Sequence, residues 1–315
     1  MQTRYQTELQ MFRDGTELGC QVLFSGGTGA EGDGGVARWS EFLEQQNEGG
    51  KRIASVCHTR PSGSFFGLAQ LSPFTRNSMA WRDLMALPTI EDRVNALRND
   101  ATRAKLIAEG IEAGDMKNLA HMLHPFGSGE TPNMDFDRKQ SLLQLAEAEG
   151  RDPVEIYVER LLASEGKEFF NFWMFGGNLD NQWKYMQLPH IVPMLGDAGA
   201  HVGFFTDSDS PTVLLSELTR EQGVYSLPEA VHRITGKSAE IIGLKQRGEL
   251  HEGWHADINI IDYENLSSCH PEYVNDFPHG GGRFVVKGKG YDATIVGGQV
   301  IIKNGKHTGN RPGQV

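Results

Sequence analysis

One acidic side chain and one histidine share the glycine-containing segment Gly196–His201 (Gly-Asp-Ala-Gly-Ala-His), which directly follows the apolar run Ile191–Leu195. In parallel α/β sheets and barrels, functional groups collect at the carboxyl ends of strands. Glycines there let the backbone turn tightly beside a ligand. A carboxylate at Asp197 can bind a metal ion, take a proton from water and return it to a leaving group. The alternative is that Asp197 caps the next helix and His201 is a packing or surface residue.

A second apolar run, Ile53–His58, ends in a cysteine and a histidine. Thiolate and neutral imidazole are both good zinc ligands, so Cys57 and His58 are candidate metal ligands. The alternative is a buried cysteine beside a histidine on the rim. Arg60 follows, and its planar guanidinium could pair with a substrate carboxylate, unless it is an ordinary surface arginine.

Two further polar segments invite a ligand interpretation. Asp207-Ser208-Asp209-Ser210 is rich in oxygen atoms but lacks the glutamate and the spacing of a calcium loop. We expect a helix to start at Ser210-Pro211, with Asp207 as a cap or a pocket residue. The glycine-rich run Ser25–Ala30 has no lysine, so we expect a flexible active-site loop rather than a phosphate loop.

These residues need strands and helices to position them. Short apolar runs alternate with amphipathic stretches up to about residue 240, which suggests βα units. The expected strands here are Cys20–Phe24, Ile53–His58, Phe169–Phe175 and Ile191–Leu195. The expected helices are Trp81–Leu97, Thr102–Glu112, Arg138–Glu149 and Pro153–Glu165, the last with Asp152 as its N-cap.

The sequence pattern changes near Gly248. From there on, Gly-Gly and Asn-Gly turns separate short apolar runs, and such turns are a strong signal of β-hairpins. The expected strands are Gly248–Leu250, Ala256–Ile261, Arg283–Lys287, Ala293–Val296 and Gln299–Lys303. The sequence therefore predicts an α/β part over residues 1–245, with a helical insertion at about 75–165, and an all-β part over residues 246–315.

The bulk composition is that of an ordinary globular protein, with 315 residues, 38% hydrophobic and 23% charged. A net charge of −11 makes a nucleic-acid partner unexpected, because phosphate attraction needs clustered lysine and arginine. Three distant cysteines predict no disulfide framework and fit a reducing cytosol. The first residues are polar and do not resemble a signal peptide. No apolar run reaches the roughly 18 residues that a membrane helix needs, so we expect a cytoplasmic protein that does not bind a membrane.

Several motifs taken together resemble the amidohydrolase superfamily, in particular its N-acyl-D-amino-acid deacylase (D-aminoacylase) branch. The likeness covers roughly Arg138–Gly313. Its motifs are the turn after Leu195, Leu142–Pro153, Arg247-Gly248-Glu249-Leu250 with Gly253 and Ala256-Asp257, Asp276-Phe277-Pro278, Gly290-Tyr291 and Gly309–Gly313.

This resemblance implies a partial (β/α)8 TIM-type barrel, comprising its later strands, followed by a small β-sandwich of the metal-dependent hydrolase type. It implies one or two zinc ions and hydrolysis of linear amide C–N bonds in an N-acyl amino acid. Metal-bound water would be the nucleophile and Asp197 the proton shuttle. The expected metal ligands are Asp197, His58 and Cys57, and His201, Arg60 and Asp207 are expected to line the substrate pocket.

The chain departs from the family in having no His-x-His pair on a strand. His121 and His124 come nearest, and we expect them to be solvated. The strands also fall short of a whole barrel. Two alternatives therefore stay open: a truncated or non-catalytic part that completes a partner, and a cyclic-amide hydrolase of the same superfamily. An incomplete barrel would expose strand edges, which predicts self-association.

Overall fold

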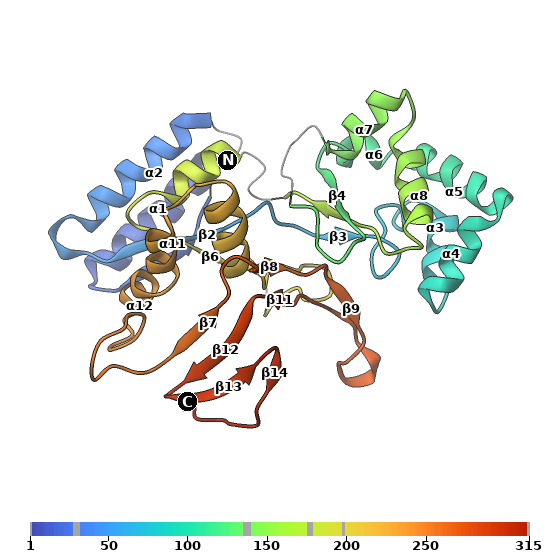
Figure 1. The fold of residues 1–315 in the computed structure, drawn as a ribbon. Helices are drawn as coiled ribbons and strands as arrows, with labels where there is room; N and C mark the ends of the chain where they lie inside the picture. The colour runs from blue at the N-terminus through green and yellow to red at the C-terminus, as the bar shows by residue number, and fades with distance from the viewer. Residues whose placement is uncertain (1, 28–31, 135–139, 175–178, 197–198, 314–315) are drawn as a thin grey trace.

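The structure, a computed structural model, describes residues 2–27, 32–134, 140–174, 179–196 and 199–313. Figure 1 shows three parts: a parallel sheet with helices around it, a helical part with its own small sheet, and a C-terminal part made of strands. Within the described ranges, no helix is long and apolar enough to cross a membrane.

The first part is built on a parallel sheet with the strand order β1-β2-β6, formed by β1 (Val22–Ser25), β2 (Ile53–His58) and β6 (Ile191–Leu195). The predicted bounds of β2 and β6 are confirmed. The surrounding helices are α1 (Gln2–Glu17), α2 (Gly32–Asn47), α9 (Leu179–Met186), α10 (Ser210–Val213), the π-helix η3 (Leu214–Glu221), α11 (Leu227–Ile234) and α12 (Gly236–Ile242). Apolar side chains of α1, α2, α9, η3 and α11 bury the sheet in one core.

The second part contains a sheet with the strand order β3-β5-β4, which is antiparallel throughout. Its strands are β3 (Phe65–Phe66), β4 (Leu123–Gly127) and β5 (Phe169–Phe172). The sequence placed β5 among parallel βα units and extended it to residue 175, and the antiparallel pairing shows that this orientation was wrong. Strand β4 lies inside the segment that was expected to be a purely helical insertion.

Six helices cover this sheet, and most begin at a residue whose side chain caps the helix. They are α3 (Met79–Ala86), α4 (Ile90–Arg98), α5 (Asp100–Ala113), α6 (Met116–Leu119), α7 (Leu142–Glu149) and α8 (Pro153–Ala163). The single helix predicted over Trp81–Leu97 is wrong. Pro88 ends α3, and the Thr89 hydroxyl accepts the N–H of Asp92 to start α4. The cap predicted at Asp152 is confirmed, as part of a capping box with Glu155.

The third part holds a four-stranded antiparallel sheet with the order β14-β13-β12-β7, visible at the bottom of Figure 1. Its strands are β7 (Ile258–Ile261), β12 (Tyr291–Val296), β13 (Gln299–Lys303) and β14 (Lys306–His307). Two short pairs join it to the rest of the molecule: β8 (Ser267–Ser268) with β11 (Gly288–Lys289), and β9 (Glu272–Val274) with β10 (Arg283–Val285). The strand predicted at Gly248–Leu250 is wrong, because Gly248 adopts a positive φ in a turn. The sandwich and the division at residue 245 stay predictions.

Candidate functional site

A polar cluster lies where strand β2 ends and the chain crosses to the antiparallel sheet. The β2 end supplies His58, Arg60 and Ser62. The loop before α10 supplies Asp207 and Asp209, and both are buried. Three residues predicted from the sequence, namely His58, Arg60 and Asp207, are thereby brought together.

Asp207 is the centre of this cluster. Its Oδ2 atom lies 3.5 Å from Nδ1 of His58 and accepts a hydrogen bond from the Ser62 hydroxyl. Burial raises the pKa of this carboxyl, but the hydrogen bond from His58, the charge of Arg60 and the hydrogen bond from Ser62 outweigh burial and leave the pKa below its ordinary value of 3.8. Asp207 is therefore a buried carboxylate that stays ionised at neutral pH.

Arg60 forms a buried ion pair rather than a surface contact. Its Nη2 atom lies 3.1 Å from Oδ1 of Asp209 and donates to the carbonyl oxygen of Thr206 at 2.8 Å. The guanidinium also sits over the ring of Phe126, with 5.5 Å between Cζ and the ring centroid. Because Arg60 is only 1% exposed, its first role is to hold the loop 206–209 against the end of β2.

Several buried polar atoms of this cluster have no hydrogen-bond partner among the residues that the structure describes. They are Nε of Arg60, Oδ1 of Asn171, Oγ1 of Thr206 and Oδ1 of Asp207. Asn171 joins the cluster from β5, since its Nδ2 donates to the carbonyl of Pro61 at 3.2 Å. Leaving a buried polar atom unpaired costs about 1–3 kcal/mol, so such a concentration marks a place where a ligand or water would be stabilised.

Two glycines permit the close approach of the segments that form the cluster. A Cβ atom at Gly63 would overlap the carbonyl oxygen of Phe172 in β5. A Cβ atom at Gly196 would lie 2.7 Å from the carbonyl oxygen of Asp207. Larger side chains at either position would push the two sheets or the aspartate loop away from the end of β2.

Two other predicted site residues, Cys57 and His201, do not join this cluster. The Cys57 thiol is fully buried in the apolar core of the first part, and burial raises its pKa strongly, which disfavours the thiolate that binds metal. His201 is exposed, has a φ of 56° and contacts the rings of Phe204 and Phe205. Asp197, predicted as catalytic base and metal ligand, lies outside the described residues.

A metal site needs several ligands that meet at one point. Nowhere in the described part of the chain do three His, Cys, Asp or Glu side chains gather closely enough to hold an ion. Among the predicted ligands, His58 places Nδ1 3.5 Å from Oδ2 of Asp207, and histidines that bind a metal commonly direct their second ring nitrogen to a carboxylate. The described residues therefore do not make a complete metal site.

Sequence reasoning missed Ser62, Asn171, Thr206 and Asp209 as members of the cluster. Asp209 stood in the oxygen-rich segment 207–210, which was set aside because it does not match a calcium loop. The sequence pattern that could have identified Asp209 is this acidic segment together with Arg60, an arginine that follows the end of a predicted strand. Asn171 carried no such signal, because it lies within an aromatic run that reads as a buried strand.

Comparison with known proteins places the chain in a family. Residues 65–302 match the family model described as "Amidohydrolase family". The chain is 36% identical over 105 residues to an N-acyl-D-aspartate deacylase of Alcaligenes xylosoxydans xylosoxydans, covering 33% of this chain and 19% of that protein. It is 37% identical over 94 residues to a dihydroorotase of Endomicrobium trichonymphae, covering 29% of this chain and 21% of that protein.

The fold is shared with a solved structure of a D-aminoacylase variant in complex with copper(II) chloride. The TM-score is 0.50 and the identity is 16%, and the match covers 97% of this chain and 52% of that chain. The chain thus spans about half the length of this structure, and the matches to the two curated relatives span smaller shares of their lengths.

Proposed function

The chain belongs to the amidohydrolase family, and from this premise we propose that it hydrolyses the amide C–N bond of N-acyl-D-amino acids. The cluster around Asp207 would be its contribution to the active site. The proposed substrate class follows from the N-acyl-D-aspartate deacylase among its relatives.

The observation that carries this proposal is the set of unpaired buried polar atoms at the carboxyl end of β2. In an α/β fold of this kind, that end of the strands is where ligands bind. A substrate or ordered water that reaches Asp207 Oδ1 and Asn171 Oδ1 would supply the hydrogen bonds that these atoms lack. Both atoms accept, so the group that binds them must donate, as an amide N–H or a water does.

In this proposal His58 would hold the metal ion, and Asp207 would act through His58. The carboxylate near Nδ1 would fix the orientation of the imidazole. Asp197 would add the carboxylate that moves a proton to the leaving nitrogen, an assignment that rests on its place directly after β6. Arg60 would keep Asp207 ionised and the loop in place through Asp209.

The metal belongs to the proposal as well. Zinc is the ion that we propose, with His58 and Asp197 among its ligands, and the described residues supply only the first of these. Elemental analysis of the purified chain after dialysis tests this directly. Stoichiometric zinc that is lost in His58→Ala but kept in His121→Ala, a variant at an exposed histidine, would support the assignment. Zinc retained equally by both variants would refute it.

The activity test uses a panel of substrates with the purified chain in the presence of zinc. We expect release of the free amino acid from N-acetyl-D-aspartate and N-acetyl-D-glutamate, and none from their L-enantiomers. The His121→Ala variant should keep this activity and the His58→Ala variant should lose it. If the chain releases no more free amino acid than the His58→Ala variant does, the alternative hypothesis is favoured. In that hypothesis the chain is a non-catalytic part that completes a partner.

A second candidate function is hydrolysis of a cyclic amide, which the match to a dihydroorotase favours. The same panel separates the two candidates when dihydroorotate is included. Ring opening of dihydroorotate, without cleavage of the N-acetyl-D-amino acids, would replace the first proposal with the second.

A further inference from the structure

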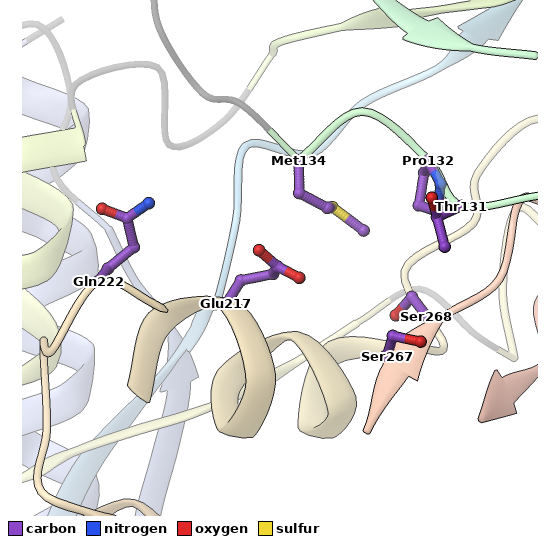
Figure 2. Close-up of a pocket in the computed structure, with 7 residues that line it drawn as sticks. All are labelled: Thr131, Pro132, Met134, Glu217, Gln222, Ser267 and Ser268. Atoms are coloured by element: carbon purple, nitrogen blue, oxygen red, sulfur yellow. The ribbon is translucent and has the colours of Figure 1, made fainter. Parts of the chain in front are cut away.

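A cavity of about 400 Å³ lies between three segments that are far apart in the sequence, and it shares no lining residue with the cluster around Asp207. Figure 2 shows its walls: the loop after β4, the π-helix η3 with the residue that follows it, and strand β8. Its lining residues are Thr131, Pro132, Met134, Glu217, Gln222, Ser267 and Ser268. A cavity of this size holds a small molecule.

Contacts outside the cavity hold its three walls together. Lys289, the residue paired with Ser267 across β8 and β11, forms an ion pair with Glu130 at 3.2 Å. The backbone N–H of His270 donates to the carbonyl of Glu130 at 2.8 Å. Arg220 on η3 donates to the carbonyl of Leu266, immediately before β8, at 3.0 Å. The walls are therefore positioned before any ligand binds, which lowers the entropy cost of binding.

The π-helix places an acidic and an amide side chain on the cavity wall. The N–H of Gln222 donates to the carbonyl of Glu217 five residues earlier, at 2.9 Å. This wider turn brings both side chains to one side of the helix, as Figure 2 shows. π-Turns are uncommon and occur often at functional sites.

Glu217 has a charge that its surroundings do not neutralise. It is half-buried and forms no ion pair with any residue in the described ranges. Arg220, the cation whose charge acts on Glu217, contacts Glu221 at 2.6 Å and donates to the carbonyl of Tyr263 at 2.6 Å. Burial raises the pKa of Glu217, the charge of Glu221 raises it further, and Arg220 only partly offsets these effects. A cation in the cavity would therefore stabilise the ionised carboxylate.

Ser268 supplies a second, independent indication of a ligand. Its side chain is 4% exposed, and its hydroxyl has no hydrogen-bond partner within the described part of the chain. Ser268 lines the same cavity as Glu217. Opposite them lie Met134 and Pro132, which offer apolar surface. The cavity thus has an acidic end, a hydroxyl in need of a partner and an apolar wall.

We propose that this cavity binds the primary ammonium group of a small aliphatic amine. An ammonium donates three hydrogen bonds, and Glu217 and Ser268 can accept two of them from within the cavity. The short alkyl chain would lie against Met134 and Pro132. A divalent metal ion is a poorer match, because Ca²⁺ and Mg²⁺ need several oxygen ligands and the lining supplies one carboxylate.

The test measures binding of n-butylammonium to the purified chain by saturation-transfer NMR and titration calorimetry at neutral pH. We expect saturable binding to the chain, and none of 1-butanol, which has the same alkyl chain without the charge. The Glu217→Gln variant should weaken binding at least about tenfold, because it removes a charged hydrogen-bond acceptor. The Ser268→Ala variant should weaken it by a smaller factor.

The matched control is Glu264→Gln, which makes the same change of charge at an exposed position nearby. It should bind n-butylammonium as the unchanged chain does. Equal unfolding midpoints for the three variants and the unchanged chain would show that the fold is intact. Butanol binding as tightly as butylammonium, or equal losses in Glu217→Gln and Glu264→Gln, would overturn the proposal.

Discussion

The helical part and the carboxyl end of β2 are both buried, but they use burial differently. In the helical part, apolar side chains from α3 to α8 form one core, and polar side chains such as Ser78 and Asp152 serve to start helices. At the end of β2, burial surrounds charged side chains, namely the pair Arg60–Asp209 and the carboxylate of Asp207. The first arrangement maximises stability, whereas the second gives up stability and therefore marks the place where function is expected.

The largest effect should come from removing the centre of the helical core. Trp81 is fully buried and donates from Nε1 to the carbonyl of Leu106 at 2.9 Å. The Trp81→Ala variant should lose about 3–5 kcal/mol of unfolding free energy, measured by urea titration, because it leaves a cavity. The exposed Met79→Ala change on the same helix should cost within about 0.5 kcal/mol. Similar losses in both variants would show that burial of Trp81 does not stabilise the helical part.

The next largest effect should come from breaking the ion pair at the end of β2. The Asp209→Asn variant leaves Arg60 buried without its ion-pair partner, with only the carboxylate of Asp207 to offset its charge, which should cost about 3 kcal/mol in the same titration. The double variant Arg60→Met, Asp209→Leu removes both charges, and its loss should be clearly smaller than the loss in Asp209→Asn. A double variant that is less stable than Asp209→Asn would show that the pair itself, rather than the uncompensated charge, dominates.

A smaller effect is expected at a helix start. The Asp152→Ala variant removes the side chain that accepts the N–H of Val154 at 2.8 Å and opens the capping box of α8. It should lose about 1 kcal/mol of unfolding free energy. The proposed rate of amide hydrolysis per folded molecule should stay unchanged, because Asp152 makes its contacts within the helical part. A change in that activity would mean that the two regions are coupled.

The smallest expected change is in the pH dependence of stability. The folded-state pKa of Asp207 is lowered, so its contribution is present above the ordinary pKa of 3.8 and is lost as the pH falls through the folded value. The difference in unfolding free energy between the chain and its Asp207→Asn variant should therefore become smaller as the pH is lowered from about 5 through the folded-state pKa of Asp207. Parallel pH profiles of the two proteins would contradict the lowered pKa.

The sequence predicted the strands of the parallel sheet better than the arrangement around them. Apolar runs that end in a polar turn gave β2 and β6 with their bounds. The run at β5 looked the same, yet this strand pairs antiparallel, because pairing partners far apart in the chain leave no local pattern. The helix predicted over Trp81–Leu97 contains Pro88, and the structure divides it there into α3 and α4.

The candidate site was predictable in its residue types but less so in its contacts. His58 and Arg60 were predicted because they stand at the end of a predicted strand, and Asp207 because it opens the oxygen-rich segment 207–210. Arg60 was expected to face a substrate, and the structure pairs it with Asp209. No local rule shows which of several nearby carboxylates an arginine will select, since that depends on how the loop 206–209 folds back on β2.

The central claim is that the cluster around Asp207 is the functional part of this chain. The most direct test is the kcat/KM of Asp207→Asn for N-acetyl-D-aspartate, measured at matched folded fractions against the unchanged chain. If Asp207 orients His58, kcat/KM should fall by about 10- to 100-fold. The same kcat/KM in both proteins would contradict the claim. Failure of both proteins to release aspartate from N-acetyl-D-aspartate would contradict it as well.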